Sequence, residues 1–354
     1  ISTPDDFTIV FNLSYADDNF LYALTNPGAM PCDEEFFNLT NGKYGLDAKY
    51  LLCNGPFHVS KWTEKTSVKL AKNNEYNGES SVSPSSVTFY INNDDSEVAD
   101  KMNSVTYDVA FLSSSQFSSI ENKKDLNSVA VQNVTYSFIF NQNDNNYRNK
   151  NMRLAFCRSC DTSSLFDSQS DISKADGIVP PSCKIGGEDY RNGNAAELLS
   201  YDETLAKKNF NDALLDLGSS SVETTILCTE QYEPFVKQMV QKLQKTLGVK
   251  FVSTVKVVSE SDLEAAVNDG NYSVAFYPFK AKSSFAGEII EGFDQNNIFG
   301  YESDVLSQKI RNIKNNSGSL EGERSAVADA ENYLVSEAVI MPVFYENSYF
   351  VTSK

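Results

Sequence analysis

Few residues of this sequence are suited to catalysis, and their spacing forms no familiar catalytic pattern. His58 is the single histidine, and it falls in a run that alternates like a strand, so a nucleophile–histidine pair is poorly supported. Neither a GxGxxG nor a GxxxxGK[ST] run is present, which leaves nucleotide binding unsupported. The 48 acidic residues offer many accidental pairs, so a carboxylate-dependent glycoside hydrolase remains a minor alternative. The residues therefore give little support to an enzyme.

The six cysteines do not form a recognisable metal or disulfide framework. Cys157 and Cys160 have the CxxC spacing, but there is no second CxxC, and a structural zinc site needs four ligands. A thioredoxin-like site places CxxC at the N-terminus of a helix, whereas this pair lies inside a run with helical period. We expect half-buried helix cysteines, and we expect no metal and no cofactor. The redox state of the cysteines stays open.

Length and charge narrow the class further. A chain of 354 residues is longer than one core usually spans, so two domains are expected. The net charge of −18 argues against nucleic acid as a partner and against direct binding to anionic lipid. No apolar run is long enough to cross a membrane, and no signal segment is visible. The chain opens on ISTPDDFTIVFNL, which reads as a strand already within a fold.

The first part of the chain is rich in strand patterns and the second part alternates strands with helices. The patterns predict a strand over 7–15, a helix over 19–25, a hairpin over 53–72, strands over 87–92 and 107–112, and two β-rich runs within 127–141. They then predict helices over 149–158 and near 161–168, a helix from Asp202 to Gly218, a βαβαβ run over 222–279, helices near 303–315 and 321–337, and a final pair of strands. The βαβαβ crossovers imply a parallel sheet covered by helices.

Six stretches of the sequence follow one another in the order of a known family. They are DDFTIVFNL with ALTNPGAMP, NGPFHVSKWTEKTSVKLAKNNEYNG, TYSFIFNQNDNNYRNKNMRLAFCRSCD, ADGIVPP, YDETLAKKNFNDALLDLG and EAVIMPVFYENSYFV. Together they resemble the extracellular solute-binding proteins of peptide and nickel ABC importers (solute-binding family 5, oligopeptide-binding-protein-like), with Arg153 and Asp161 at the family's Arg and Asp positions. Each stretch alone is weak, but six in this order over nearly the whole chain are specific.

The resemblance implies an α/β fold of the type II periplasmic-binding-protein kind, with two hinged lobes. Residues 1–134 would form a partial lobe I, residues 135–345 a complete lobe II, and residues 346–354 the start of a return to lobe I. We therefore expect a fragment that lacks the family's N-terminal part and C-terminal end.

The same resemblance implies a function in transport. The chain would capture an extracellular solute, expected to be an oligopeptide, between the lobes and deliver it to an ABC permease in the membrane. We expect a monomer that is lipid-anchored on the extracellular face of the membrane or that is periplasmic. A sensor or partner-docking protein on the same fold is the main alternative.

The resemblance also suggests where a ligand would bind. Peptides bind in this family as an added strand, and a lobe II strand with its following loop carries an aromatic residue and an aspartate that pairs with the peptide's N-terminal amine. In the matching segment Phe279 takes the aromatic position and Lys282 the aspartate position, while Pro278, which has no N–H to donate, replaces a small residue. Tyr277, Phe279, Lys280 and Lys282 are therefore candidate ligand-binding residues.

Lys282 reverses the charge expected at that position, and two interpretations stay open. In the first, the ligand differs, either an anionic group or a peptide in another register, and Lys280 or Lys282 supplies the counter-charge. In the second, the loop has shifted, both lysines are solvated, and another acid such as Glu288 or Glu291 pairs with the amine. Two ammonium groups about 4 Å apart repel by about 1 kcal/mol even in water, so both interpretations separate Lys282 from a peptide amine.

Further candidates lie on the two strands expected to cross between the lobes. These are Tyr136, Phe138 and Asn141 on the first strand, and Phe344 and Tyr345 on the last. Aromatic side chains at such positions are core residues at least as often as ligand contacts, so a structure has to distinguish the two roles.

Overall fold

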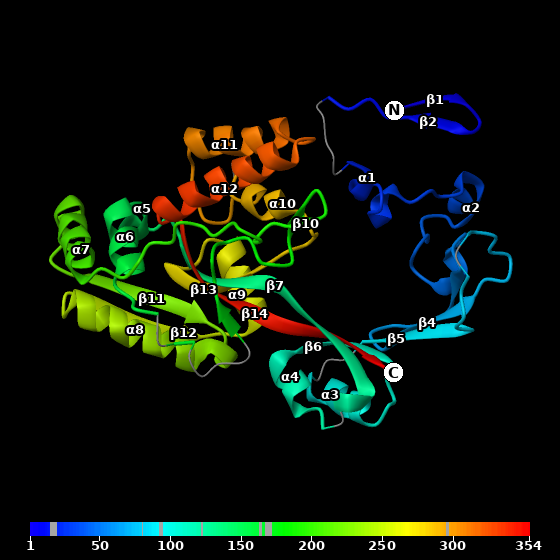
Figure 1. Cartoon of the computed structure of the whole chain (residues 1–354), viewed down its shortest axis with the longest axis horizontal. Coiled ribbons are helices and arrows are strands. Elements are labelled where there is room, and N and C mark those ends of the chain that lie inside the picture. The colour runs from blue at the N-terminus through cyan, green and yellow to red at the C-terminus, as the bar shows by residue number, and fades with distance from the viewer. Residues whose placement is uncertain are drawn as a thin grey trace. The chain divides into compact units, whose positions relative to one another are not determined.

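The computed structural model describes residues 1–14, 20–79, 81–91, 95–121, 123–162, 165–166, 172–294 and 297–354. The chain divides into two compact units (Figure 1). Unit 1 comprises Ile1–Asn19, Ser113–Ser115 and Ser128–Phe350, and unit 2 comprises Phe20–Leu112, Gln116–Asn127 and Val351–Lys354.

The long strands β7 (Leu126–Phe140) and β14 (Ile340–Ser353) each contribute residues to both units. The boundaries predicted from the sequence, after residues 134 and 345, fall on these same two strands. Residues 1–14 group with unit 1.

Unit 2 is built from short helices and a three-stranded sheet. The sheet has the order β3 (Phe57–Thr63), β4 (Ser67–Lys72) and β5 (Ser86–Tyr90), with antiparallel neighbours. The hairpin predicted over 53–72 is confirmed, because Thr63 pairs with Ser67 across the polar turn. The other elements of unit 2 are α1 (Phe20–Ala23), η1 (Pro27–Ala29), α2 (Glu34–Leu39), η2 (Ala48–Tyr50), α3 (Asp95–Asn103), β6 (Val109–Ser113) and η3 (Lys123–Asp125), and α4 (Ser114–Ser119) continues from β6.

A mixed sheet forms the centre of unit 1. Its strands follow the order β12 (Phe251–Val257), β11 (Val222–Cys228), β13 (Val274–Lys280), β7 and β14, with β8 (Ile172–Lys174) beside β14 and with β6 beside the end of β14 that belongs to unit 2. Strand β11 is parallel to β12 and β13, whereas β13 is antiparallel to β7. The crossovers are α8 (Glu233–Leu247) and α9 (Glu260–Asn268). The predicted βαβαβ run and the α/β class are therefore confirmed.

The remaining elements of unit 1 surround this sheet. They are β1 (Ser2–Asp5), β2 (Thr8–Val10), α5 (Asn145–Arg148), α6 (Lys150–Arg158), β9 (Lys184–Ile185), β10 (Glu188–Asp189), α7 (Glu203–Leu217), η4 (Glu230–Tyr232), α10 (Ala286–Glu291), α11 (Asp304–Asn315) and α12 (Leu320–Ser336). Helix α7 has the predicted ends, because the Asp202 side chain accepts a hydrogen bond from the Leu205 N–H and Gly218 has the left-handed φ of 63°. Part of the helix predicted near 161–168 lies outside the described residues.

Two predictions about strands were wrong in the same way. The two β-rich runs within 127–141 are the single strand β7, and the final pair of strands is the single strand β14. Within β7, Gln132 Nε2 donates to Asn347 Oδ1 of β14 at 2.6 Å and to Ser173 Oγ of β8 at 2.8 Å. These contacts join β7 to β14 and β8, which are far from it in the sequence, so no local pattern indicates them.

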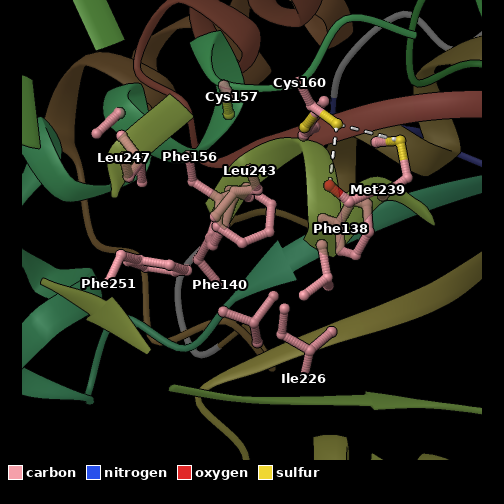
Figure 2. Packing of buried hydrophobic residues seen from close by; sticks show 14 of the residues in the cluster. Phe138, Phe140, Phe156, Cys157, Cys160, Ile226, Met239, Leu243, Leu247 and Phe251 are labelled. Carbon is pink, nitrogen blue, oxygen red and sulfur yellow. Dashed lines mark hydrogen bonds between the residues drawn. The ribbon is translucent and has the colours of Figure 1, made fainter. Parts of the chain in front are cut away.

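The sheet of unit 1 has a hydrophobic cluster on each face. On one face Phe138 and Phe140 pack with α6 and α8 (Figure 2). Phe276 and residues of α7 belong to the same cluster. On the other face Ile139 and Ala275 pack with α9, α10, α11 and α12. Alternation along β7 and β13 therefore sends successive side chains into different cores, which is typical of an α/β sheet covered on both sides. No helix among the described residues is both long and apolar enough to span a membrane.

Candidate functional site

Strand β13 carries the segment predicted to anchor the ligand. It pairs with β7 so that Phe279 lies opposite Thr135 and Lys280 opposite Val134. Because successive side chains of a strand point to opposite faces, Tyr277 and Phe279 share one face of the sheet and Lys280 lies on the other. The predicted segment is therefore divided between two environments.

The aromatic position of this segment is held by the core of unit 1. The Phe279 ring stacks on Phe293, with centroids 5.7 Å apart and planes at 17°, and it contacts Phe299 at 5.7 Å. The Tyr277 ring meets Phe279 edge-on at 5.7 Å, and burial raises the pKa of Tyr277. Both side chains are half-buried, so they close the end of one core and leave some ring surface accessible.

The two lysines of the segment are exposed. Lys280 and Lys282 make no ion pair with any acid in the described part of the chain. The Glu288 carboxylate accepts a hydrogen bond from Ser283 Oγ at 2.5 Å, and Ser283 Oγ in turn accepts from the Phe285 N–H. Glu288 therefore fixes the loop that follows β13, and the part that Lys282 plays toward a ligand stays a prediction.

A second group of polar and aromatic side chains lies on the face that carries Lys280. We call Tyr136, Tyr232 and Glu346 the Glu346 cluster. Tyr232 OH donates to Glu346 Oε1 at 2.6 Å and accepts from Gln231 Nε2 at 3.2 Å. The rings of Tyr136 and Tyr232 lie 4.4 Å apart between centroids. The cluster joins three elements, β7, η4 and β14, within unit 1.

The surroundings of Glu346 stabilise its negative charge only weakly. Burial raises the pKa of Glu346, and the negative charge of Glu260 acts in the same direction, whereas the Tyr232 hydrogen bond and the positive charge of Lys280 lower it. Glu346 is half-buried and forms no ion pair within the described residues. Burial also raises the pKa of Tyr136 and of Tyr232, so both keep their phenolic protons at neutral pH.

Sequence reasoning named Tyr136 but missed Tyr232 and Glu346. The available signal was weak, namely a single glutamate in the run VFYENSYF, which had been assigned to a strand ending. Phe344 lies on the same face as Glu346 by alternation, and its ring contacts those of Tyr136 and Tyr232. Tyr232 follows β11 in the chain, so only the sheet order brings it to β7 and β14.

Two predicted ligand residues lie in the interior instead. Phe138 has 0 % exposed surface and packs against Phe156 and Phe276. Asn141 Nδ2 donates to the carbonyl oxygens of Gly270 and Tyr272, which ties the end of β7 to the turn before β13. A ligand could reach the side chain of Phe138 or Asn141 only if the core opened.

Tyr345 is also buried, and it holds a loop. Its hydroxyl accepts from the Asp176 N–H at 3.1 Å and lies 3.4 Å from the Gly177 and Val179 carbonyl oxygens. Burial raises the pKa of Tyr345. These partners belong to the ADGIVPP stretch, so Tyr345 stabilises that loop from β14.

The same loop is fixed by a buried ion pair. Glu331 of α12 accepts from the Ile178 N–H at 2.7 Å and the Val179 N–H at 2.9 Å, and from Tyr190 OH at 3.0 Å. Its carboxylate also binds the Arg191 guanidinium with both oxygens. Glu331 is 1 % exposed and has all its hydrogen-bonding capacity used.

Cys157 and Cys160 lie in the hydrophobic cluster that contains Phe138 and Phe140. Helix α6 ends at Arg158, so Cys160 lies just beyond the helix rather than within it. The Cys160 thiol points at the backbone oxygen and the sulfur of Met239, each at 3.4 Å (Figure 2). Burial raises the pKa of Cys157 and of Cys160 to about 12, which disfavours the reactive thiolate. The described residues contain no group of three or more His, Cys, Asp or Glu placed to hold a metal ion.

Comparison with known families gives one match over most of the chain. The model of the bacterial extracellular solute-binding proteins, family 5 (middle part), matches residues 1–299. Among curated proteins, the dipeptide-binding protein DppE of Bacillus subtilis is 23% identical over 355 aligned positions, which cover 98% of this chain and 64% of DppE. The chain thus spans somewhat less than two thirds of the length of that relative.

Solved structures share the fold. The dipeptide-binding protein of Pseudoalteromonas sp. SM9913, in complex with Met-Leu, superposes with a TM-score of 0.73 at 15% identity and covers 97% of this chain and 69% of its own. The periplasmic binding protein DppA of Helicobacter pylori, in complex with the peptide STSA, superposes with a TM-score of 0.72 at 19% identity and covers 99% of this chain and 69% of its own. The predicted periplasmic-binding-protein-like fold is confirmed.

Proposed function

Because this chain belongs to the bacterial extracellular solute-binding proteins of family 5, we propose that it is the solute-binding component of an ABC importer and that its solute is a peptide. The family match over residues 1–299 is the observation that carries the proposal. The relatives compared above, a dipeptide-binding protein and structures in complex with peptides, support the choice of solute.

The proposed action is reversible binding without covalent chemistry. The buried thiols have raised pKa values, and the single histidine, His58, is exposed on β3. The end of β13 and the loop after it carry the half-buried Tyr277 and Phe279 and the exposed Lys280 and Lys282. They support binding of an extended ligand, since a strand end offers backbone groups and alternating side chains to a peptide. The long strands β7 and β14 would carry any hinge motion, because each contributes to both units.

We further propose the setting in which the protein acts. It would bind its peptide on the extracellular face of the membrane, lipid-anchored, or in the periplasm, as a monomer, and deliver the peptide to a membrane permease. The net charge of −18 argues against nucleic acid as a partner and against direct electrostatic binding of the protein surface to anionic lipid.

Isothermal titration of the complete gene product with pools of dipeptides, tripeptides and longer peptides tests this proposal. We expect at least one pool to bind with a Kd of about micromolar or tighter, which corresponds to about −8 kcal/mol. Absence of heat from every pool, with a protein that melts cooperatively, would exclude peptide capture as the function.

A further inference from the structure

The Glu346 carboxylate lies in an environment that a cationic ligand would complete. It is half-buried, and its Oε1 accepts one hydrogen bond, from Tyr232. No described residue donates a hydrogen bond to Oε2, and no described cation lies within ion-pair distance. A partly desolvated carboxylate without a counter-ion costs free energy, which a bound cation would recover.

The neighbours of this carboxylate suit an ammonium group in particular. An ammonium has three N–H donors and no acceptor, and it binds both a carboxylate through a charge-assisted hydrogen bond and the face of an aromatic ring. Tyr136 and Tyr232 supply two rings whose centroids are 4.4 Å apart, and the second of them is bonded to the carboxylate itself.

From this arrangement we propose that the Glu346 cluster is the subsite that binds the α-ammonium group of a peptide. The inference rests on the proposed function and specifies Glu346 as the acid that recognises the free N-terminus of the peptide. It also explains how a peptide receptor can carry Lys282 at the position where the family resemblance leads one to expect an aspartate. Of the two acids considered near that loop, Glu288 is already bonded to Ser283.

Lys280 contributes a positive charge near this subsite. Its charge acts on Glu346 and lowers the pKa of that group, yet the two side chains form no ion pair and Lys280 is exposed. Lys280 can therefore remain in water while a ligand ammonium binds directly to the Glu346 carboxylate. A ligand whose amine is blocked would leave Glu346 without a cation and would bind less tightly.

The test is a titration of the complete chain with one peptide that binds, in its free and its N-acetylated forms. For the wild-type protein we expect the acetylated peptide to bind about 10- to 100-fold more weakly, the range of a lost hydrogen bond to a charged group. Glu346→Gln should bring the ratio of the two affinities close to one. Glu223→Gln, at an exposed position of the same sheet, removes the same charge and should keep the wild-type ratio.

The outcomes separate this inference from the function on which it rests. If no peptide binds, the proposed function fails and the subsite with it. If peptides bind but the wild-type protein does not distinguish the two forms, or Glu346→Gln retains the wild-type ratio, the subsite is wrong and the function stands. Should Glu346→Gln fail to fold, Glu346→Ala also removes the carboxylate, and a wild-type ratio in that variant would overturn the inference.

Discussion

Two glutamates in unit 1 differ in how completely the protein satisfies them. Glu331 is 1 % exposed and is bound by Arg191, by Tyr190 and by two backbone N–H groups. Glu346 is half-buried and receives one hydrogen bond, from Tyr232. The first carboxylate has every partner within the fold, whereas the second has one hydrogen bond and no counter-ion among the described residues.

The difference indicates different roles. A fully satisfied buried acid contributes to a unique arrangement of the chain, here the loop between Ala175 and Pro180. Gly177 shows how closely that network is packed, because a Cβ there would lie 2.2 Å from Arg191 Nη2. An acid left without a counter-ion contributes less to folding and is available to a ligand. We therefore assign Glu331 to stability and Glu346 to recognition.

The largest expected effect is on stability, at Glu331. Glu331→Gln would leave the buried Arg191 guanidinium without its counter-charge and should lower the free energy of unfolding by about 3–5 kcal/mol. Chemical denaturation checks this, and the fraction that remains folded should keep the wild-type preference for a free N-terminus. A loss below about 1 kcal/mol would contradict the structural role.

The next effect is on the pH dependence of binding. Because burial raises the pKa of Glu346, affinity for a free-amine peptide should fall as the pH is lowered from neutral through that raised pKa. The N-acetylated peptide shares the same C-terminal carboxylate and should lack this step. For stability the sign is opposite, since an acid with a raised pKa in the folded state favours folding at low pH and loses that contribution as the pH rises. Parallel titration curves for both peptides would count against the assignment.

A smaller effect is expected at the hydroxyl of Tyr232. Tyr232→Phe keeps the ring but removes the hydrogen bond to Glu346, and it should weaken binding of the free-amine peptide about fivefold, or about 1 kcal/mol. Tyr201→Phe removes an exposed hydroxyl of the same unit and serves as the matched control. Equal affinities in the two variants would show that the Tyr232 hydroxyl does not support the ligand.

The smallest effect is expected at the exposed lysines. Lys280→Met removes a charge that competes with the ligand ammonium and should strengthen binding of the free-amine peptide about twofold. Lys282→Met provides the comparison, because no contact links Lys282 to the Glu346 cluster among the described residues. A larger change at Lys282 than at Lys280 would favour the interpretation in which Lys282 lines the ligand site.

The sequence predicted the local elements better than the site. The hairpin over 53–72 and the βαβαβ run depend on neighbouring residues, and their periodic patterns were sufficient. Strands β7 and β14 run unbroken through contacts between residues that are far apart in the chain, such as the hydrogen bond from Gln132 to Asn347. No local pattern contains that information.

The candidate site shows the same limit. Tyr277 and Phe279 were named from a contiguous motif, and the structure places them on one face of β13. The side chains of the Glu346 cluster lie on three different elements, β7, η4 and β14. Only the strand order β11, β13, β7 and β14 brings them together. Phe138 and Tyr345 could not be told from ligand contacts because an aromatic residue in a strand has the same sequence pattern in either role.

A crystal structure of the complete protein with a bound peptide tests the account most directly. We predict that the peptide's α-ammonium nitrogen lies about 2.7–2.9 Å from a Glu346 carboxylate oxygen, the usual length of such a charge-assisted bond, with the Tyr136 and Tyr232 rings beside it. An α-ammonium bound instead to Glu288, to Glu291 or to another acid, with Glu346 still in contact with Tyr232 alone, would contradict it.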